Sequence, residues 1–435
     1  MPTHEIKECD LDIAHEAEKI SHHPYTLFFD SNRPQHPESK WSFLCYDPIE
    51  IITAKNGVII HNDTIIEKTD IFDFLQTRLN NYTFEKNADI PFMGGIAGYW
   101  GYDLGRDLES ISQNTIDDLT LPDLCVGLYT NMIAYNHAQS KTWLIGEKPK
   151  IKTPYPTPID WAQDVTFTPQ TSDDDYKKNI QKIIDYIYAG EIYQANMSRR
   201  FDAFLPKGLN SYSHYKHMRT VNPAPFSAYM NFGDFQFGSC SPERFLKVEN
   251  GVVQTKPIKG TLPAYKNADI LKNSQKDRAE NLMIVDLLRN DISKVCLPHS
   301  VKVPSLCNIE TFEGVHHMVS TVTGTLAESQ NALSLLKACF PGGSITGAPK
   351  IRAMQVIEEL EKTRRGPYCG AMGYIGFNGN MDTNIIIRTV IYKKDKVYLQ
   401  TGSGIVSDSD PSEELQEGLD KASKIFESFI NETLK

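Results

Sequence analysis

Apolar and polar residues alternate along much of the first part of the chain in the manner of β-strands. The β-branched runs 58–60 and 64–66 flank the turn-forming residues 61–63, and this arrangement predicts a β-hairpin. The strongest change in composition lies between Lys148 and Thr171, where a proline-rich stretch precedes a stretch rich in threonine and glutamine. We therefore expect a boundary near residue 165, between a sheet-rich N-terminal region (1–165) and a C-terminal region (166–435).

A helix and then a strand are predicted directly after this boundary. Residues 172–190 have helical periodicity, because Ser172 can cap the start, isoleucines recur at helical spacing and Gly190 can end the helix. In residues 191–201 the odd positions, Tyr193 among them, are largely apolar, and the even positions are polar. These polar positions are Gln194, Asn196 and Ser198. One face of this strand should pack on the core, and the other can line a polar site.

A second hairpin is predicted around Asn250-Gly251, the strongest short-range signal for a two-residue turn between strands. Such a turn pairs Glu249 with Val252. Counting outward in this register places Lys259 beside Glu243, although nearby prolines interrupt regular pairing and leave the facing of the side chains open. The register predicts that an acid and a lysine meet at the open end of the hairpin.

Two further helices are predicted, from about Ala268 to Arg289 and from about Pro411 to Phe429, and each carries two carboxylates three residues apart. The pairs are Asp277 with Glu280 and Glu414 with Glu417. Residues at this spacing share one helical face and can converge on a hard cation such as Mg²⁺. Spacing alone favours solvated surface carboxylates over a metal site. The mixture of hairpins and amphipathic helices predicts an α+β fold.

The composition indicates a folded globular protein that acts on small molecules or other proteins. The net charge is −10 without a run of like charges, which argues against nucleic-acid binding and a polybasic membrane patch. The polar N-terminus and the lack of any stretch of about 18 apolar residues predict no signal peptide, no membrane span and a cytoplasmic location. The eight cysteines include no Cys-x-x-Cys pair, so we expect reduced thiols and no zinc site.

The glycine-rich segment 340–350 has two glycines, Gly342 and Gly347, at the spacing of a phosphate-binding loop. A P-loop needs lysine and serine or threonine directly after the second glycine, and Ala348-Pro349 stands there instead. A nucleotide hydrolase is therefore not indicated, but glycine-rich backbone can still approach an anionic ligand.

Taken together, these segments resemble the chorismate-utilising enzymes, which include anthranilate, aminodeoxychorismate, isochorismate and salicylate synthases. The segments that carry the resemblance follow one another in order, and Gly94–Tyr99 extends it into the N-terminal region. They are Ser241–Phe245, Pro257–Thr261, Asp277–Asp291, Val315–Ser320, Phe340–Lys350, Gly366–Gly370, Ile387–Thr389, Thr401–Val406 and Glu414–Glu417. The resemblance implies the fold of anthranilate synthase component I, in which two β-sheets pack face to face with helices outside. The N-terminal region would then interleave with a chorismate-binding catalytic domain.

The resemblance also implies roles for individual residues. Three carboxylates would hold Mg²⁺, which grips the ring carboxylate of chorismate, with Asp277 a shorter contributor; the three are Glu280, Glu414 and Glu417. The positions implied to bind the rest of the substrate are Arg388, Tyr368, Ser344, Gly402 and Lys421. A dianionic substrate needs a guanidinium and a metal, and a departing hydroxyl needs a proton. The catalytic positions are Lys259 as nucleophile, Glu243 as general acid and His317 facing the ring.

Two positions distinguish between reactions within the family. A lysine at position 259 resembles the aminodeoxychorismate synthases, whereas anthranilate synthases typically carry a small residue there. It implies attack by Lys259 on the ring with loss of the 4-hydroxyl, and then displacement of the lysine by ammonia. The product would be 4-amino-4-deoxychorismate, in the 4-aminobenzoate branch of folate biosynthesis. At Gln194, isochorismate- and salicylate-forming relatives usually have a lysine that activates water, so hydrolytic isomerisation is disfavoured.

Two alternatives stay open at this point. Anthranilate synthase component I would release pyruvate from the same substrate, and product mass would tell the two enzymes apart. A non-catalytic tryptophan or indole sensor is an alternative of another class, because residues 27–31 and 222–226 resemble tryptophan-binding elements. Such a site would include Ser31 and Pro223, although plain core packing explains both segments equally well.

The source of nitrogen follows from a missing motif. Class I glutamine amidotransferases need a cysteine nucleophile on a Gly-x-Cys-x-Gly type of turn, and none of the eight cysteines has these neighbours. Cys369 comes nearest, but Pro367 and Tyr368 precede it. We therefore expect a separate glutamine amidotransferase subunit to supply ammonia.

Overall fold

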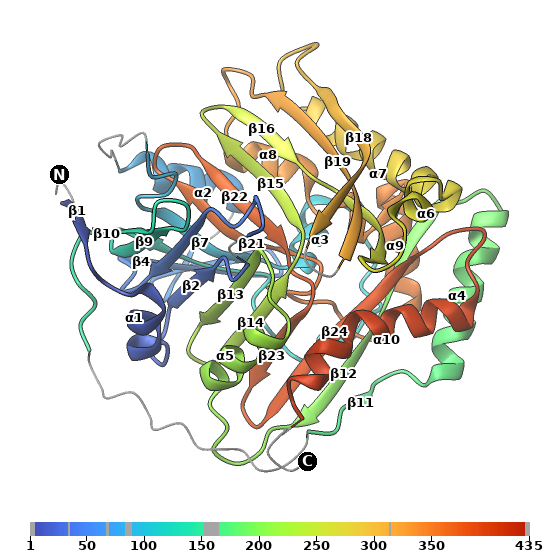
Figure 1. Ribbon diagram of the computed structural model, residues 1–435, viewed down its shortest axis with the longest axis horizontal. Coiled ribbons are helices and arrows are strands. Elements are labelled where there is room, and N and C mark those ends of the chain that lie inside the picture. The colour runs from blue at the N-terminus through green and yellow to red at the C-terminus, as the bar shows by residue number, and fades with distance from the viewer. Residues whose placement is uncertain are drawn as a thin grey trace.

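The computed structural model describes residues 5–33, 35–66, 69–82, 89–151, 165–312 and 315–430. Within these ranges all 24 strands belong to two large sheets of twelve strands each, in which neighbouring strands pair antiparallel (Figure 1). The proline-rich part of the expected boundary, residues 152–164, lies outside the described residues.

The first sheet joins strands from both ends of the chain. Its order is β1 (Ile6–Cys9), β10 (Lys141–Ile145), β9 (Met132–Asn136), β3 (Trp41–Cys45), β2 (Thr26–Asp30), β13 (Phe226–Asn231), β14 (Phe235–Ser241), β23 (Thr389–Lys393), β24 (Lys396–Ile405), β12 (Gln194–Phe204) and β11 (Thr168–Pro169), with β20 (Gly347–Ala348) on β12.

The second sheet also mixes early and late strands. Its order is β17 (Ile258–Pro263), β19 (Val315–Thr325), β16 (Val252–Thr255), β15 (Arg244–Glu249), β22 (Met381–Ile385), β21 (Ala371–Gly376), β7 (Gly95–Trp100), β8 (Leu124–Tyr129), β4 (Glu50–Lys55), β5 (Val58–His61) and β6 (Thr64–Ile66), with β18 (Lys302–Phe312) on β19. Strands from before and after residue 165 therefore lie side by side in both sheets.

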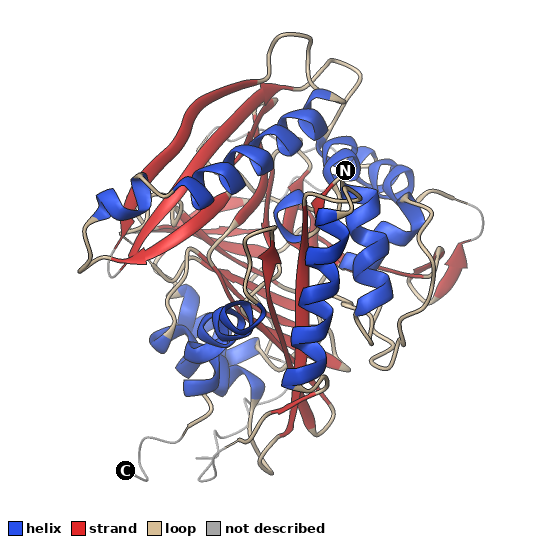
Figure 2. Cartoon of the chain, turned by 90° about the vertical axis from the view of Figure 1, so that its right-hand side faces the viewer, coloured by secondary structure: helices blue, strands red, loops and turns tan. Residues whose placement is uncertain are grey.

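Helices pack on the outer faces of the strand layers, and some strands reach the edge of the molecule in Figure 2. They are α1 (Ile13–Ile20), α2 (Ile71–Asn80), α3 (Gly105–Leu108), α4 (Asp173–Tyr188), α5 (Ser211–Val221), α6 (Ala268–Lys272), α7 (Gln275–Ser293), α8 (Ala332–Cys339), α9 (Lys350–Leu360) and α10 (Pro411–Glu427), with 3₁₀ turns η1 (Tyr102–Leu104) and η2 (Gly343–Ile345). In the part of the chain that the structure covers, no helix is long and apolar enough to cross a membrane.

The hydrophobic core explains the layered arrangement. Between the sheets, Phe43 and Phe237 of the first sheet share one buried cluster with Tyr99 and Tyr374 of the second. A separate cluster covers the other face of the first sheet with residues of α1, α5 and α10. Each sheet therefore buries one face against the other sheet and its opposite face under helices, which confirms the predicted α+β architecture.

Local signals predicted some helices correctly and one incorrectly. Helix α4 begins after Ser172, whose Oγ accepts a hydrogen bond from the backbone N–H of Asp175 at 3.2 Å. Helix α10 begins at Pro411, as predicted. The single helix expected from Ala268 to Arg289 was wrong, because the chain breaks it at residues 273–274. There Asn273 ends α6, and the Ser274 side chain caps the new helix α7.

Both predicted hairpins form, but the strand pairing of the second hairpin ends earlier than predicted. Strands β5 and β6 pair around the turn, and Glu249 pairs with Val252 as expected. Strand β16 then ends at Thr255, and β17 pairs with β19 instead of β15. Pro257 lacks a backbone N–H for continued pairing, so the predicted placement of Lys259 by hairpin register was wrong.

The strand expected at residues 191–201 begins later than predicted. Strand β12 starts at Gln194, and Tyr193 before it is 71% exposed and does not pack on the core. Within the strand the alternation holds: Ala195 and Met197 join a core with α4 and α9, and Gln194 and Asn196 lie on the opposite face.

Candidate active site

Lys259 and Glu280 form the centre of the site. The Lys259 Nζ donates to Glu280 Oε1 at 2.6 Å, and both side chains are largely buried. Gly260 follows with φ +80°, and a Cβ added there would lie 2.8 Å from Asp277 Oδ1. Only glycine allows this backbone conformation without strain next to α7. The glycine therefore lets β17 bring the lysine against the helix that carries Glu280.

Glu243 lies near the same lysine, although not through the hairpin register. It occupies the short link between β14 and β15 and is 8% exposed. Burial raises the pKa of the Glu243 carboxyl, while Lys259 and Ser344 favour its charged form. A carboxyl with a raised pKa retains a proton more readily, which suits a general acid.

Burial lowers the pKa of the Lys259 ammonium, but the nearby Glu280 and Glu243 carboxylates outweigh burial and raise it overall. Burial opposes ionisation of Glu280 as well, and Lys259 outweighs it, so that the Glu280 pKa is lowered. The two groups therefore form an ion pair in this structure. Attack by the lysine requires that its proton first move to another group.

The remaining carboxylates implied as metal ligands lie on α10. Glu414 is 3% exposed. Its Oε1 accepts a hydrogen bond from Ser409 Oγ at 2.6 Å, and its Oε2 has no hydrogen-bond partner among the residues described. Glu417 pairs with Lys421, whose Nζ lies 2.6 Å from Glu417 Oε1 and also donates to the Gly402 carbonyl at 3.2 Å.

The residues present fit a magnesium ion in the chemistry of their donors. Three carboxylates supply the hard oxygen ligands that Mg²⁺ prefers, and the unpaired Glu414 Oε2 is a buried anionic atom that a cation would satisfy. Each of the three carboxylates also pairs with a lysine. Lys276 Nζ lies 3.8 Å from Glu414 Oε1, and Glu280 and Glu417 pair with Lys259 and Lys421. Within the described ranges no three His, Cys, Asp or Glu side chains are already grouped as a metal site.

A glycine on β24 permits the contact between Gln194 and Glu280. The Gln194 Nε2 donates to Glu280 Oε1 at 3.1 Å. A Cβ added at Gly404 would lie 2.3 Å from this nitrogen and 3.1 Å from Glu280 Oε1. Any larger residue at position 404 would displace both side chains, so this glycine keeps the polar face of β12 in contact with α7.

The residues implied to bind the substrate come from five segments. Arg388 adopts φ +50° between β22 and β23, and its carbonyl accepts a hydrogen bond from the backbone N–H of Cys240. Ser344 lies in η2, and Tyr368 is buried in the loop before β21. The positive charges of Lys421 and Arg388 both favour the ionised form of the Glu243 carboxyl and so act to lower its pKa. The structure thus brings these cations toward the same centre as Lys259.

His317 lies on β19, opposite β17. Its Nδ1 is 3.0 Å from Thr261 Oγ1. Burial and the positive charge of Arg388 lower the pKa of His317 to about 4. The imidazole is therefore neutral at pH 7 and can accept or donate a hydrogen bond without adding charge to the site.

A buried ion pair supports the site, and sequence reasoning missed it. Arg365 donates to both oxygens of Glu361 and also to the carbonyls of Ile345 and Asn196. Glu361 in turn accepts from the backbone and hydroxyl of Ser198. The pair thus links the glycine-rich loop, β12 and the loop that carries Tyr368. The only signal in the sequence was an arginine pair directly before Gly366.

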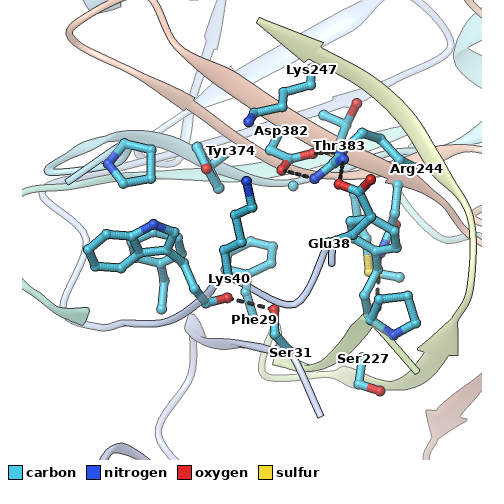
Figure 3. A pocket seen from close by; sticks show the side chains of 18 of the residues that line it. Phe29, Ser31, Glu38, Lys40, Ser227, Arg244, Lys247, Tyr374, Asp382 and Thr383 are labelled. Atoms are coloured by element: carbon cyan, nitrogen blue, oxygen red, sulfur yellow. Dashed lines mark hydrogen bonds and ion pairs between the residues drawn. The ribbon is translucent and has the colours of Figure 1, made fainter. Parts of the chain in front are cut away.

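Of the two residues implied for tryptophan, Ser31 lines a cavity and Pro223 is not among its lining residues. Ser31 lines a cavity of about 120 Å³ between the sheets, with aromatic walls that include Phe29 and Tyr374 (Figure 3). The Ser31 hydroxyl donates to the Trp41 carbonyl at 2.6 Å. Pro225, two residues further along the chain, is one of the lining residues.

Charged side chains form the other wall of this cavity. Arg244 pairs with Asp382 and Glu38 there, as the dashed lines in Figure 3 mark. Glu38 also binds Lys256, three residues before Lys259, with 2.9 Å between Nζ and Oε1. Two successive residues, Glu243 and Arg244, therefore face the catalytic centre and the cavity respectively.

Comparison with known proteins agrees with this geometry. Residues 25–427 match the family described as chorismate binding enzyme. The chain belongs to this family of enzymes, and the residues assembled around Lys259 form its candidate active site.

The curated relatives of the chain include aminodeoxychorismate synthases and anthranilate synthases. The chain is 39% identical to aminodeoxychorismate synthase component 1 of Salmonella typhimurium, with 95% of this chain and 94% of that protein covered. It is 33% identical to the protein of the same name in Bacillus subtilis, with 88% of each chain covered. Anthranilate synthase component 1 of Mycolicibacterium smegmatis is also 33% identical, with 93% of this chain and 85% of that protein covered.

Solved structures support the fold. Anthranilate synthase component I from Streptococcus pneumoniae superimposes with a TM-score of 0.81 at 33% identity, and 89% of this chain and 92% of that chain are covered. The menaquinone-specific isochorismate synthase MenF of Escherichia coli shares the fold at 17% identity, with a TM-score of 0.74 and coverage of 99% and 95%. The predicted fold, that of anthranilate synthase component I, is confirmed.

Proposed function

We propose that this chain acts as aminodeoxychorismate synthase component I and converts chorismate and ammonia to 4-amino-4-deoxychorismate. The observation that carries the proposal is the position of Lys259, which pairs with Glu280 at 2.6 Å and feels the charge of the Glu243 carboxylate in the candidate active site. Relatives named aminodeoxychorismate synthase component 1 support it. The product would enter the 4-aminobenzoate branch of folate biosynthesis.

The proposed reaction has two substitutions. In the first, the Lys259 Nζ forms a C–N bond to the ring while the C–O bond of the 4-hydroxyl breaks. Glu243 passes the proton released by the lysine to the departing hydroxyl, which leaves as water. In the second, ammonia forms the new C–N bond and the bond to Lys259 breaks, which regenerates the lysine amine.

Each charged part of the substrate has a proposed partner. Arg388 would hold one carboxylate through its guanidinium, with Tyr368, Lys421 and the backbone of Gly402 nearby. Ser344 and His317 would face the ring. Glu280, Glu414 and Glu417 would hold Mg²⁺, which when bound supplies positive charge for the second carboxylate.

The test is product identification. The purified chain is incubated with chorismate, Mg²⁺ and an ammonium salt. The products are then separated by chromatography and their masses are measured by mass spectrometry. We expect a product with the mass of 4-amino-4-deoxychorismate and no pyruvate. Formation of anthranilate with pyruvate would support the anthranilate synthase alternative, and binding without turnover would support the sensor.

A trapped intermediate tests the role of Lys259 directly. When ammonia is withheld, we expect wild-type protein to gain the mass of chorismate less one water on the peptide that contains Lys259. The variant Lys259→Arg serves as a matched control, since it keeps the positive charge beside Glu280 and cannot act as the same nucleophile. An adduct on another residue would contradict the assignment.

We propose that nitrogen comes from a separate glutamine amidotransferase subunit, because no cysteine of this chain has the neighbours of such a nucleophile. The isolated chain should use ammonium salts and not glutamine. Product formation from glutamine by the rigorously purified chain would contradict this.

The cavity at Ser31 supports a second, non-catalytic proposal, a site for tryptophan. Its aromatic walls and its mixture of charges suit a ring with an ammonium and a carboxylate group. Calorimetric titration with tryptophan checks this, with Ser31→Trp as a variant that fills the cavity. Heat of binding that persists in the variant would place tryptophan elsewhere.

A further inference from the structure

A short segment of the N-terminal region holds the loop that carries Tyr368. In the 3₁₀ turn η1, the backbone N–H of Tyr102 donates to the Gly366 carbonyl at 2.7 Å. The next residue, Asp103, accepts a hydrogen bond from the Gly366 N–H on its Oδ2, also at 2.7 Å. Both backbone polar groups of Gly366 are therefore bound by a segment that lies 263 positions earlier in the chain.

Two glycines permit this close approach of the two segments. A Cβ added to Gly101 would lie 3.0 Å from the Gly366 carbonyl oxygen, which is closer than an ordinary van der Waals contact. Gly366 adopts φ +57°, a left-handed conformation that favours glycine. The start of the loop therefore has a defined backbone conformation, and Asp103 is the side chain that fixes it by a hydrogen bond.

The other end of the loop is bound to the segment that leads to Arg388. The N–H of Cys369 donates to the Ile386 carbonyl at 2.8 Å, and the N–H of Ile386 donates to the Gly370 carbonyl at 2.9 Å. Two residues, Pro367 and Tyr368, lie between this attachment and the one at Gly366, so the position of Tyr368 depends on both. Burial raises the pKa of Tyr368, so its hydroxyl stays protonated and can donate to a carboxylate.

Asp103 is itself fixed by an ion pair. Its Oδ1 accepts a hydrogen bond from Arg106 Nε at 2.7 Å, and Arg106 also pairs with Glu358 on α9. Asp103 is 2% exposed, and burial raises the pKa of its carboxyl, while Arg106 and the Gly366 N–H favour the charged form. A hydrogen bond to a carboxylate is roughly twice as strong as one between neutral groups. Asp103 therefore binds the loop to a part of the fold that α9 holds in place.

We propose that Asp103 is a positioning residue for chorismate binding, because it holds the loop at Gly366 in the conformation in which Tyr368 can bind a substrate carboxylate. The inference rests on the proposed function, which gives chorismate as the substrate and Tyr368 as part of its site. Without the carboxylate, the loop would also populate other conformations. Only the fraction of molecules in the binding conformation could then take up chorismate, and the apparent affinity falls by that fraction.

The test is steady-state kinetics followed by the loss of chorismate, a signal that does not depend on which product forms. Asp103→Ala removes the carboxylate, and Asp103→Asn keeps an acceptor for the Gly366 N–H without the charge. We expect the KM for chorismate to rise roughly 10-fold or more in Asp103→Ala, as for one lost hydrogen bond to a charged group, and by a smaller factor in Asp103→Asn. The kcat and the KM for ammonium should change less than about twofold, because saturating chorismate selects the binding conformation.

Asp123→Ala is the matched control. Asp123 is 3% exposed and, like Asp103, accepts from one backbone N–H and one cationic side chain. The donors are Asn56 N at 2.7 Å and Lys55 Nζ at 3.2 Å, so this carboxylate holds the turn between β4 and β5 and not the Tyr368 loop. We expect a comparable loss of stability in urea but the wild-type KM for chorismate.

Two results would overturn the role of Asp103. One is a wild-type KM for chorismate in both Asp103 variants, which would show that the loop keeps its conformation without the carboxylate. The other is a general structural effect, seen either as an equal rise in Asp123→Ala or as a lower kcat with an unchanged KM for chorismate. If Asp103→Ala does not fold, the comparison of Asp103→Asn with Asp123→Asn decides in the same way.

The product separates this inference from the proposed function. If the wild type consumes chorismate but forms a product other than 4-amino-4-deoxychorismate, the proposed function is wrong, and the KM for chorismate still tests Asp103. If the wild type does not turn chorismate over, the proposed function is again wrong. Calorimetric titration of the same variants with chorismate then replaces the KM, and unchanged affinity in the Asp103 variants would overturn the positioning role as well.

Discussion

Removal of the Arg365 guanidinium should destabilise the protein far more than removal of an arginine from the surface. The Arg365 side chain is 1% exposed and its partner Glu361 is 5% exposed. The variant Arg365→Met keeps the aliphatic length of the side chain and removes the charge. Glu361 would then be a buried carboxylate without its counter-ion, and the Ile345 and Asn196 carbonyls would each lose a donor.

The magnitude follows from these contacts. Breaking a buried ion pair on one side costs about 3–5 kcal/mol. The two hydrogen bonds from Ser198 to Glu361 remain and offset part of the loss, so we expect about 3 kcal/mol in the free energy of unfolding. The control is Arg352→Met. Arg352 pairs with Glu191 at the surface, where the side chains are 34% and 40% exposed, and such pairs contribute about 0–1 kcal/mol.

The assay is urea unfolding at pH 7, followed by tryptophan fluorescence. The double variant Arg365→Met/Glu361→Gln should recover part of the stability, because it also removes the unpaired charge. If Arg365→Met loses no more stability than Arg352→Met, the buried pair does not stabilise the fold as argued. Arg365→Lys should recover little, since an ammonium cannot replace the several directed hydrogen bonds of a guanidinium.

Further predictions concern catalysis and pH. Glu414→Gln should weaken Mg²⁺ binding by roughly tenfold or more, measured by calorimetry, because it removes an anionic ligand; unchanged affinity would exclude Glu414 as a ligand. Lys259→Ala should slow amination by roughly 100-fold or more, and a wild-type rate would remove it from the mechanism. The ammonium-driven rate should climb from about pH 7 to 9 as free ammonia increases, and a flat profile would count against free ammonia as nucleophile. Burial opposes ionisation of Glu38, but Arg244 and Lys256 outweigh it and lower its pKa to about 2. Because this pKa lies below the ordinary 4.5, its stabilising effect is present above about pH 5 and is lost as the pH falls toward 2. The difference in urea midpoint between wild type and Glu38→Gln should therefore shrink in that range, and a constant difference would contradict the ion pairs.

Several parts of the fold could be predicted from short stretches of sequence. The turn at Asn250-Gly251 and the caps of α4 and α10 depend on residues a few positions apart, so local pattern was sufficient. The motifs of the family likewise indicated most of the candidate site residues, because each motif keeps its chemistry within a short segment. The break at Ser274 was missed, since a capping serine inside an otherwise helical pattern gives a weak signal.

Only the tertiary structure decided which distant residues meet. Strand β17 pairs with β19 and not along its own hairpin, and this pairing brings Lys259 to Glu280 on α7. The contact of Gln194 with Glu280, and the links from Arg365 to β12 and the glycine-rich loop, likewise join residues far apart in the chain. Local periodicity depends on neighbouring residues. Contacts between sheets and helices depend on how the whole chain buries its apolar surface, which no short segment of sequence specifies.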